Sequence, residues 1–152
     1  AGQQEFGLRG GTVDSISAIV FAKTMRLALE DHQKNEVKIK RLNQKLWDAF
    51  EGVEGIIINS PKNGTPYIFN VSIENVGSEI MMNALNLADI YVSAKSTCHS
   101  ESNQPSHVLK AIGRTNTQAL SSIRLSLSSE ITEGDIESVI KVILETKDYV
   151  QH

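Results

Sequence analysis

The sequence predicts an α+β fold in which two long N-terminal helices are followed by a small, mainly antiparallel sheet covered by helices. Apolar residues recur at helical spacing over residues 16–29 and again over residues 36–50. Beyond residue 55 the pattern changes to short β-branched runs bounded by turn formers. With 152 residues, 40% of them apolar, the chain is long enough to bury a core, so we expect one domain over residues 1–152.

A glycine-rich loop over residues 1–12 precedes the first helix, which we expect Asp14 or Ser15 to cap. This helix is apolar on most of its sides, which is typical of a helix buried between two layers. Its apolar residues are Ile16, Ala18, Ile19, Val20, Phe21, Ala22, Met25, Leu27, Ala28 and Leu29. The second helix has a narrower inner stripe, formed by Ile39, Leu42, Leu46, Phe50 and Val53.

The remaining elements are short, and turn formers or helix caps separate them. In chain order we expect a strand at 55–59, a turn at 61–66, a strand at 67–73, a helix from Ser78, a short strand at 90–92, a polar loop at 93–105, a short helix at 106–113, a strand at 122–127 and a last helix from Thr132. The core stripe of the last helix is Ile136, Val139, Ile140 and Ile143. Helices followed by a separate group of strands indicate an α+β arrangement.

Composition and charge exclude several classes of protein. The net charge of −3 offers no electrostatic attraction to nucleic acid, no apolar stretch approaches the ~18 residues of a membrane span, and Ala1–Glu5 lacks the regions of a signal peptide. The single cysteine, Cys98, excludes an internal disulfide, and the four histidines lack metal-ligand spacing. We therefore expect no DNA, no membrane, no metal and a reducing, cytoplasmic compartment.

Cys98 lies in the polar loop, and two interpretations of this residue stay open. A lone cysteine is most often a small buried hydrophobe. Here, however, no apolar side chain occurs in the six residues after it, and the nearby positive charges of Lys95 and His99 would favour a reactive thiolate. His99 itself is adjacent to Cys98 in sequence, which disfavours a nucleophile–base pair and favours a solvent-exposed histidine.

Arg124 and Thr12 are two further candidate site residues. Arg124 interrupts an apolar strand, so it either points to solvent or binds an anion such as a carboxylate through its planar fork, and spacing alone favours solvent. Thr12 ends the glycine-rich loop before a helix, where backbone N–H groups and a hydroxyl can cradle a phosphate. A flexible linker would have a similar composition.

The motifs in this order resemble those of one enzyme family. They are the glycine-rich segment Gly2–Thr12, the two helices, the strand Pro66–Ser72, the loop Ser93–Cys98, the run Pro105–Ala111 and the strand Ser121–Ser126. Together they are similar to the C-terminal part of cysteine desulfurases, which are pyridoxal 5'-phosphate enzymes of fold type I in the class V aminotransferase family. The resemblance covers essentially all 152 residues.

The resemblance implies a role for each candidate residue. Cys98 matches the loop cysteine that takes sulfur from L-cysteine and becomes a persulfide, leaving L-alanine. Arg124 matches the arginine that holds the substrate α-carboxylate. Thr12 matches the threonine that reaches the cofactor phosphate of the partner subunit, which implies a homodimer. The sulfur would pass to an acceptor protein, either an iron–sulfur scaffold or a tRNA-thiolation protein.

The sequence also departs from the family pattern. Lys95 and Thr97 stand where the family loop commonly has glycine and alanine. The family's cofactor lysine lies in a motif ending His-Lys, and no lysine of this chain lies in such a motif. We therefore expect a C-terminal small domain that lacks the lysine domain, holds no cofactor covalently and is inactive alone. The alternatives are another class V enzyme, such as a selenocysteine lyase or an aminotransferase-like relative, and, for the isolated chain, a non-catalytic domain that dimerises or binds a scaffold protein.

Overall fold

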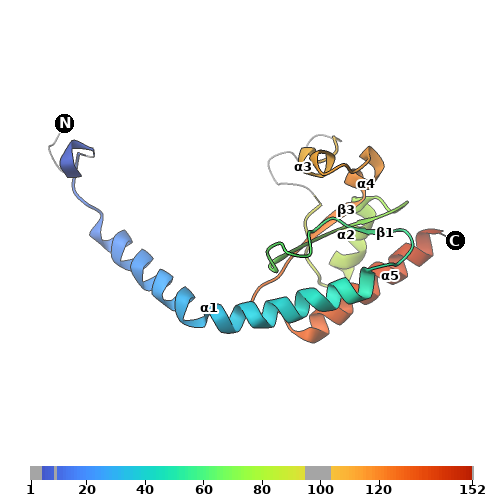
Figure 1. Cartoon of the computed structure of the whole chain (residues 1–152), viewed down its shortest axis with the longest axis horizontal. Coiled ribbons are helices and arrows are strands. Elements are labelled where there is room, and N and C mark those ends of the chain that lie inside the picture. The colour runs from blue at the N-terminus through green and yellow to red at the C-terminus, as the bar shows by residue number, and fades with distance from the viewer. Residues whose placement is uncertain (1–4, 9, 95–103, 152) are drawn as a thin grey trace. The chain divides into compact units, whose positions relative to one another are not determined.

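The computed structural model of the chain describes residues 5–8, 10–94 and 104–151. Its internal contacts divide the chain into an N-terminal unit, Ala1–Asn35, and a C-terminal unit, Glu36–His152. Figure 1 labels the helices and strands in chain order. The α+β class expected from the sequence is confirmed, because helices surround a sheet of three antiparallel strands.

The N-terminal unit contains a short 3-10 turn, η1 (Glu5–Gly7), and the first part of the long helix α1 (Ser15–Phe50). Asp14 caps α1, since its Oδ1 accepts a hydrogen bond from the backbone N–H of Ser17 at 3.0 Å. The Ser17 hydroxyl donates to the other carboxylate oxygen at 2.6 Å, and these two bonds hold the pKa of Asp14 below its ordinary value. Of the two expected caps, Asp14 is the one used.

The two helices predicted for the N-terminal half form one continuous helix, α1. The prediction of a break was wrong because the polar stretch over residues 30–35 contains neither glycine nor proline, the two residues that interrupt a helix most strongly. A change from apolar to polar composition alters which sides of a helix can be buried, but it does not end the helix.

The apolar side chains in the first part of α1 are exposed, contrary to the expectation that they are buried. Ile16, Phe21 and Leu29 expose 74%, 66% and 66% of their surface. In the described part of the N-terminal unit, η1 is the only element besides α1, so no second layer exists there to cover the helix. The apolar pattern does predict a helix, but burial of its apolar side chains requires a partner element, and the described part of this unit contains no element besides η1 that could serve as one.

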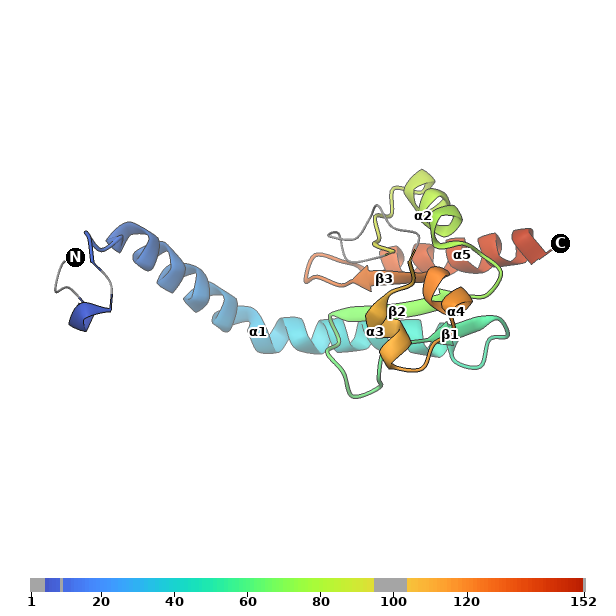
Figure 2. The same ribbon diagram turned by 90° about the horizontal axis from the view of Figure 1, so that it is seen from above.

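The sheet of the C-terminal unit consists of β1 (Ile56–Ile58), β2 (Ile68–Ile73) and β3 (Ser122–Ser126), in that order and with antiparallel pairing (Figure 2). These strands lie where the sequence predicts them. The expected turn between β1 and β2 also forms, since the N–H of Gly64 donates to the carbonyl of Pro61 at 3.0 Å.

The short strand predicted at residues 90–92 does not form. The N–H of Ile90 donates to the carbonyl of Leu85 at 2.9 Å, so the segment begins as the C-terminal cap of α2 (Ser78–Leu87) rather than as a strand. Only Ser93 reaches the sheet, where it forms an isolated antiparallel bridge with Arg124.

The core forms between one face of the sheet, the C-terminal half of α1, α2 and α5 (Glu133–Gln151) (Figures 1 and 2). Phe69 lies at its centre, with its ring 6.0 Å from the Trp47 ring and 6.1 Å from the Phe50 ring between centroids. The fully buried side chains of this core include Ile39, Leu42, Leu46, Phe50, Phe69, Val71, Ile73, Met81, Leu85, Ile123 and Ile143. The predicted core stripes of residues 36–50 and of the last helix are therefore confirmed.

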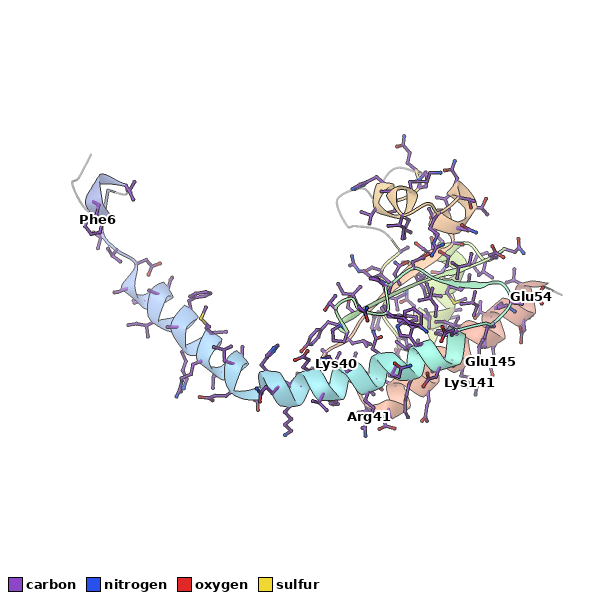
Figure 3. The ribbon with its side chains drawn as sticks, viewed as in Figure 1. Phe6, Lys40, Arg41, Glu54, Lys141 and Glu145 are labelled. Atoms are coloured by element: carbon purple, nitrogen blue, oxygen red, sulfur yellow. The ribbon has the colours of Figure 1, made fainter. Side chains whose placement is uncertain are left out.

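Ion pairs connect α1 to α5 at the surface. Glu133 accepts from Lys45 and from Arg41, each at 2.5 Å. The hydrogen bond from Lys45, followed by the charges of Arg41 and Lys45, lowers the pKa of Glu133. Further along α5, Lys141 and Glu145 form an exposed pair at 3.8 Å (Figure 3).

Two short helices, α3 (His107–Ala111) and α4 (Asn116–Leu120), lie on the other side of the sheet (Figure 1). The helix predicted at 106–113 corresponds to α3, but α4 was not predicted. Its signal is present in the sequence: Thr115 accepts from the Gln118 N–H while the Gln118 side chain accepts from the Thr115 N–H. This reciprocal capping box can start even a short helix.

We predict that Phe69→Ala destabilises the chain by about 3–5 kcal/mol, because it removes a fully buried ring and leaves a cavity between Trp47 and Phe50. Urea unfolding followed by circular dichroism would measure the change. Leu87→Ala, at a side chain that is 90% exposed, should shift the free energy of unfolding by less than about 0.5 kcal/mol. Equal losses in the two variants would contradict the assignment of Phe69 to the core.

Glu133→Gln should lower stability in a pH-dependent way. A carboxyl group whose pKa falls on folding stabilises the fold above its unfolded pKa, here 4.5, and this contribution disappears as the pH drops through the lower folded pKa. The difference in urea midpoint between wild type and Glu133→Gln should therefore be constant at neutral pH and shrink below about pH 4.5. A difference that grows on acidification would contradict the ion-pair interpretation.

Candidate functional site

The face of the sheet opposite the core is polar. Side chains alternate between faces along a strand, so Asn70 and Ser72 of β2 lie on the same face as Arg124 and Ser122 of β3. The register places Asn70 opposite Arg124 and Ser72 opposite Ser122. This face is tied to α4, since the Ser72 hydroxyl donates to the carbonyl of Gln118 at 2.7 Å.

Asn59, which is buried directly after β1, is the centre of a hydrogen-bond network on this face. Its Oδ1 accepts from Nε of Arg114 at 2.6 Å. Its Nδ2 donates to Oδ1 of Asn70 at 2.7 Å and to Oγ of Ser72 at 2.8 Å. Arg114 also donates to the carbonyl of Ile58 at 3.1 Å, so the network joins β1 and β2 to the loop before α4.

Sequence reasoning missed this network. Asn70 gave a signal, because it is an amide in an otherwise apolar and β-branched run. Asn59 follows three isoleucines and looks like a turn former, and Arg114 lies in a polar stretch with no motif around it. The pairing of residues 55 positions apart could not be found from local spacing.

Arg124 is half-buried in β3, and its backbone is fully paired. Its N–H donates to the carbonyl of Ser93 at 2.6 Å, and its carbonyl accepts from the N–H of Ser93 at 3.2 Å. Nε of Arg124 is buried and has no hydrogen-bond partner among the described residues. A buried donor without an acceptor is costly, so this arrangement is suited to an anionic ligand that would supply one.

The other predicted site residues lie elsewhere. Cys98, with its neighbours Lys95 and His99, falls outside the described residues. Thr12 belongs to the N-terminal unit, where it is exposed ahead of α1, whereas Arg124 belongs to the C-terminal unit. His32 and His107 are exposed on α1 and α3, as expected for surface groups.

Residues 5–8, 10–94 and 104–151 contain no cluster of three or more His, Cys, Asp or Glu side chains that could hold a metal ion. No helix there is both long and apolar enough to cross a membrane.

Comparison with known proteins identifies the family. Residues 2–139 match the family described as Aminotransferase class-V. The chain belongs to the class-V aminotransferase family. A cysteine desulfurase IscS from Enterobacter sp. (strain 638) is 36% identical over 143 residues, and a mitosomal cysteine desulfurase from Encephalitozoon cuniculi (strain GB-M1) is 37% identical over 145 residues. These matches cover 93% and 95% of this chain but 35% and 33% of the relatives.

The solved structures agree with this assignment to the class-V aminotransferases. A NifS-like protein from Rickettsia africae superposes with a TM-score of 0.76 at 29% identity, over 97% of this chain and 39% of that one. The chain thus spans about a third of the length of the curated relatives that it matches. The resemblance to fold type I enzymes expected from the sequence is confirmed by these findings.

Class-V aminotransferases and cysteine desulfurases depend on pyridoxal phosphate, and the chain offers this cofactor only some of its ligands. The exposed hydroxyl of Thr12 follows Gly11, which has a positive φ of 105° and no described atom within 4 Å of the place where a Cβ would lie. This loop fits an anionic group such as the cofactor phosphate. The aldehyde would require a lysine, and the chain contains no His-Lys pair of the kind that the family uses.

If Arg124 serves a ligand rather than the fold, Arg124→Met should leave the free energy of unfolding unchanged within about 0.5 kcal/mol or raise it, because no described side chain loses a bond. Urea unfolding of the chain would measure this. The neighbouring Ile123→Ala, on the core face, should cost about 2–5 kcal/mol. A comparable loss in Arg124→Met would assign Arg124 to the structure of the sheet instead.

Proposed function

We propose that the protein containing this chain is a pyridoxal-phosphate-dependent cysteine desulfurase, and that this chain is its C-terminal small domain. The relatives named above are cysteine desulfurases, which supports the reaction class. The observation that carries the proposal is Arg124 on β3, whose buried Nε has no acceptor among the residues that the structure describes. Arg124 is bonded to Ser93, the residue that leads into the segment containing Cys98.

Arg124 binds the α-carboxylate of L-cysteine in this proposal. A guanidinium group presents donors in a planar fork that matches the two oxygens of a carboxylate. The backbone pairing of Arg124 on both sides, with Asn70 in register on β2 and with Ser93 through hydrogen bonds, fixes the base of the side chain. An arginine anchored in this way orients the substrate as well as attracting it.

Cys98 accepts the sulfur. Ser93 is bridged to Arg124, and five residues of chain lead from Ser93 to Cys98. Because five residues span at most about 18 Å, Cys98 stays within that distance of Ser93. The Cys98 thiolate attacks the substrate sulfur, forming an S–S bond while the C–S bond breaks with its electron pair on carbon. Protonation of that carbon gives L-alanine, and Cys98 is left as a persulfide. Pyridoxal phosphate, when bound, supplies the electron sink for this bond cleavage.

The proposal also includes a role for Thr12, a partner subunit and a protein that accepts the sulfur. The Thr12 hydroxyl, at the N-terminal side of α1, holds the cofactor phosphate of the partner subunit, which requires a homodimer. The persulfide then passes its outer sulfur to an acceptor protein, an iron–sulfur scaffold or a tRNA-thiolation protein. The isolated chain is inactive because it lacks the cofactor lysine motif. The single cysteine among its 152 residues fits a reducing, cytoplasmic compartment.

Two variants of the full-length protein test the proposed reaction. Cys98→Ser should abolish persulfide formation, because a hydroxyl cannot store sulfur. Arg124→Lys should raise KM for L-cysteine by about tenfold or more, because an ammonium replaces a bidentate fork with a point charge. Alanine release and persulfide labelling with a thiol-specific reagent provide the two readouts.

Lys141→Gln, at an exposed site on α5, serves as a control that should leave both readouts unchanged. Persulfide that still forms in Cys98→Ser would remove Cys98 from the reaction. An unchanged kcat/KM in Arg124→Lys would show that Arg124 does not bind the substrate and would favour the alternative of a strand arginine that points to solvent.

A further inference from the structure

Asn70 and Arg124 form a close cross-strand pair. In an antiparallel ladder, both backbone groups of a residue point to the same neighbouring strand. Those of Arg124 bond to Ser93, whereas the N–H of Asn70 donates to the Ser60 hydroxyl and its carbonyl accepts from the N–H of Asn59 at 2.8 Å. Asn70 and Arg124 are therefore a non-hydrogen-bonded pair, the kind in which Cα atoms approach to about 4.5 Å and side chains lie closest.

Arg114 and Ser72 together determine which way the amide of Asn59 points, because the Ser72 hydroxyl donates its single proton to the carbonyl of Gln118 and its oxygen can therefore only accept from Asn59. A guanidinium group can only donate hydrogen bonds, so the atom of Asn59 that faces Arg114 must be its oxygen. The amide nitrogen of Asn59 then faces Asn70 and Ser72, and both of these bonds are short, at 2.7 and 2.8 Å.

The orientation of Asn59 in turn orients Asn70. Since Nδ2 of Asn59 donates, Asn70 must accept with its Oδ1, and Nδ2 of Asn70 is the terminal atom that does not face Asn59. None of the hydrogen bonds among the described residues uses Nδ2 of Asn70. Two N–H donors are thus available beside Arg124, on the residue that faces it across the strands.

We propose that Nδ2 of Asn70 donates to the same carboxylate that Arg124 binds, and that Arg114, acting through Asn59, is a positioning residue for this amide. The identity of the ligand as an amino-acid carboxylate rests on the proposed function. Among the described residues, neither Nε of Arg124 nor Nδ2 of Asn70 has an acceptor, and the two residues belong to the same face of the sheet, so a single anion can satisfy both.

The test compares two competitive inhibitors of the full-length enzyme, L-alanine and ethylamine, which differ only by the carboxylate. Asn70→Ala should raise Ki for L-alanine by about tenfold, the effect of losing one hydrogen bond to a charged group, and leave Ki for ethylamine unchanged. Asn70→Asp, which keeps an oxygen for Asn59 but replaces the donors with a negative charge, should raise Ki for L-alanine further. Asn63→Asp makes the same change in the exposed turn before β2 and should alter neither constant.

Arg114 is tested by the variants that keep or remove its donor. Arg114→Lys can still only donate, so it should retain the orientation of the relay and a near wild-type Ki for L-alanine. Arg114→Met removes the donor that faces Oδ1 of Asn59 and leaves only Ser72 to orient the amide, so it should raise Ki for L-alanine several-fold with kcat unchanged.

Three outcomes separate this proposal from the proposed function. A parallel rise of both inhibition constants in the Asn70 variants would show a merely structural role and overturn the proposal. An unchanged Ki for L-alanine in both Asn70→Ala and Asn70→Asp would also overturn it, while a raised Ki in Arg124→Lys would leave the substrate site in place. If Arg124→Lys has no effect either, the proposed function itself fails.

Discussion

The two backbone hydrogen bonds between Ser93 and Arg124 are the constraint on which the polar side of the sheet depends. Both the N–H and the carbonyl of Arg124 bond to Ser93, so Arg124 forms no backbone hydrogen bond with Asn70, the residue opposite it on β2. The two residues can therefore interact only through their side chains. They also attach the start of the segment that contains Cys98 to the strand that carries the arginine. These two hydrogen bonds thereby fix the position of β3 relative to the Asn59–Asn70 network and to the start of the segment that contains Cys98.

The sheet separates stability from chemistry by its two faces. Phe69 and its aromatic neighbours on α1 fill the core face, where burial supplies the favourable free energy. One residue further along β2, Asn70 belongs to the opposite face, where the donors of Arg124 and the Asn59 network lie. Because alternate residues of the same strand serve the two purposes, the site can be rigid without being made of core residues.

Local patterns in the sequence predicted most of the secondary structure and a part of the site. The strands, the core stripe of α5 and the cap at Asp14 follow from periodicity and from short-range hydrogen bonding, which depend on residues close in sequence. The break predicted in α1 was wrong, because a polar stretch without glycine or proline continues a helix. Arg124 was a candidate by its residue type, whereas the relay from Arg114 to Asn70 depends on residues that only the folded sheet brings together.

The hydrogen-bond relay on the polar face also limits the order in which its members can be replaced during evolution. While an arginine occupies position 114, the amide at position 59 has one permitted orientation. An aspartate at position 59 would lose the N–H groups that now donate to Asn70 and Ser72. Loss of the arginine first would leave Ser72 as the remaining group that orients the Asn59 amide, and so weaken the selection on the two asparagines. Positions 59, 70 and 114 are thus expected to diverge as a group, with Arg114 as the member whose replacement releases the other two.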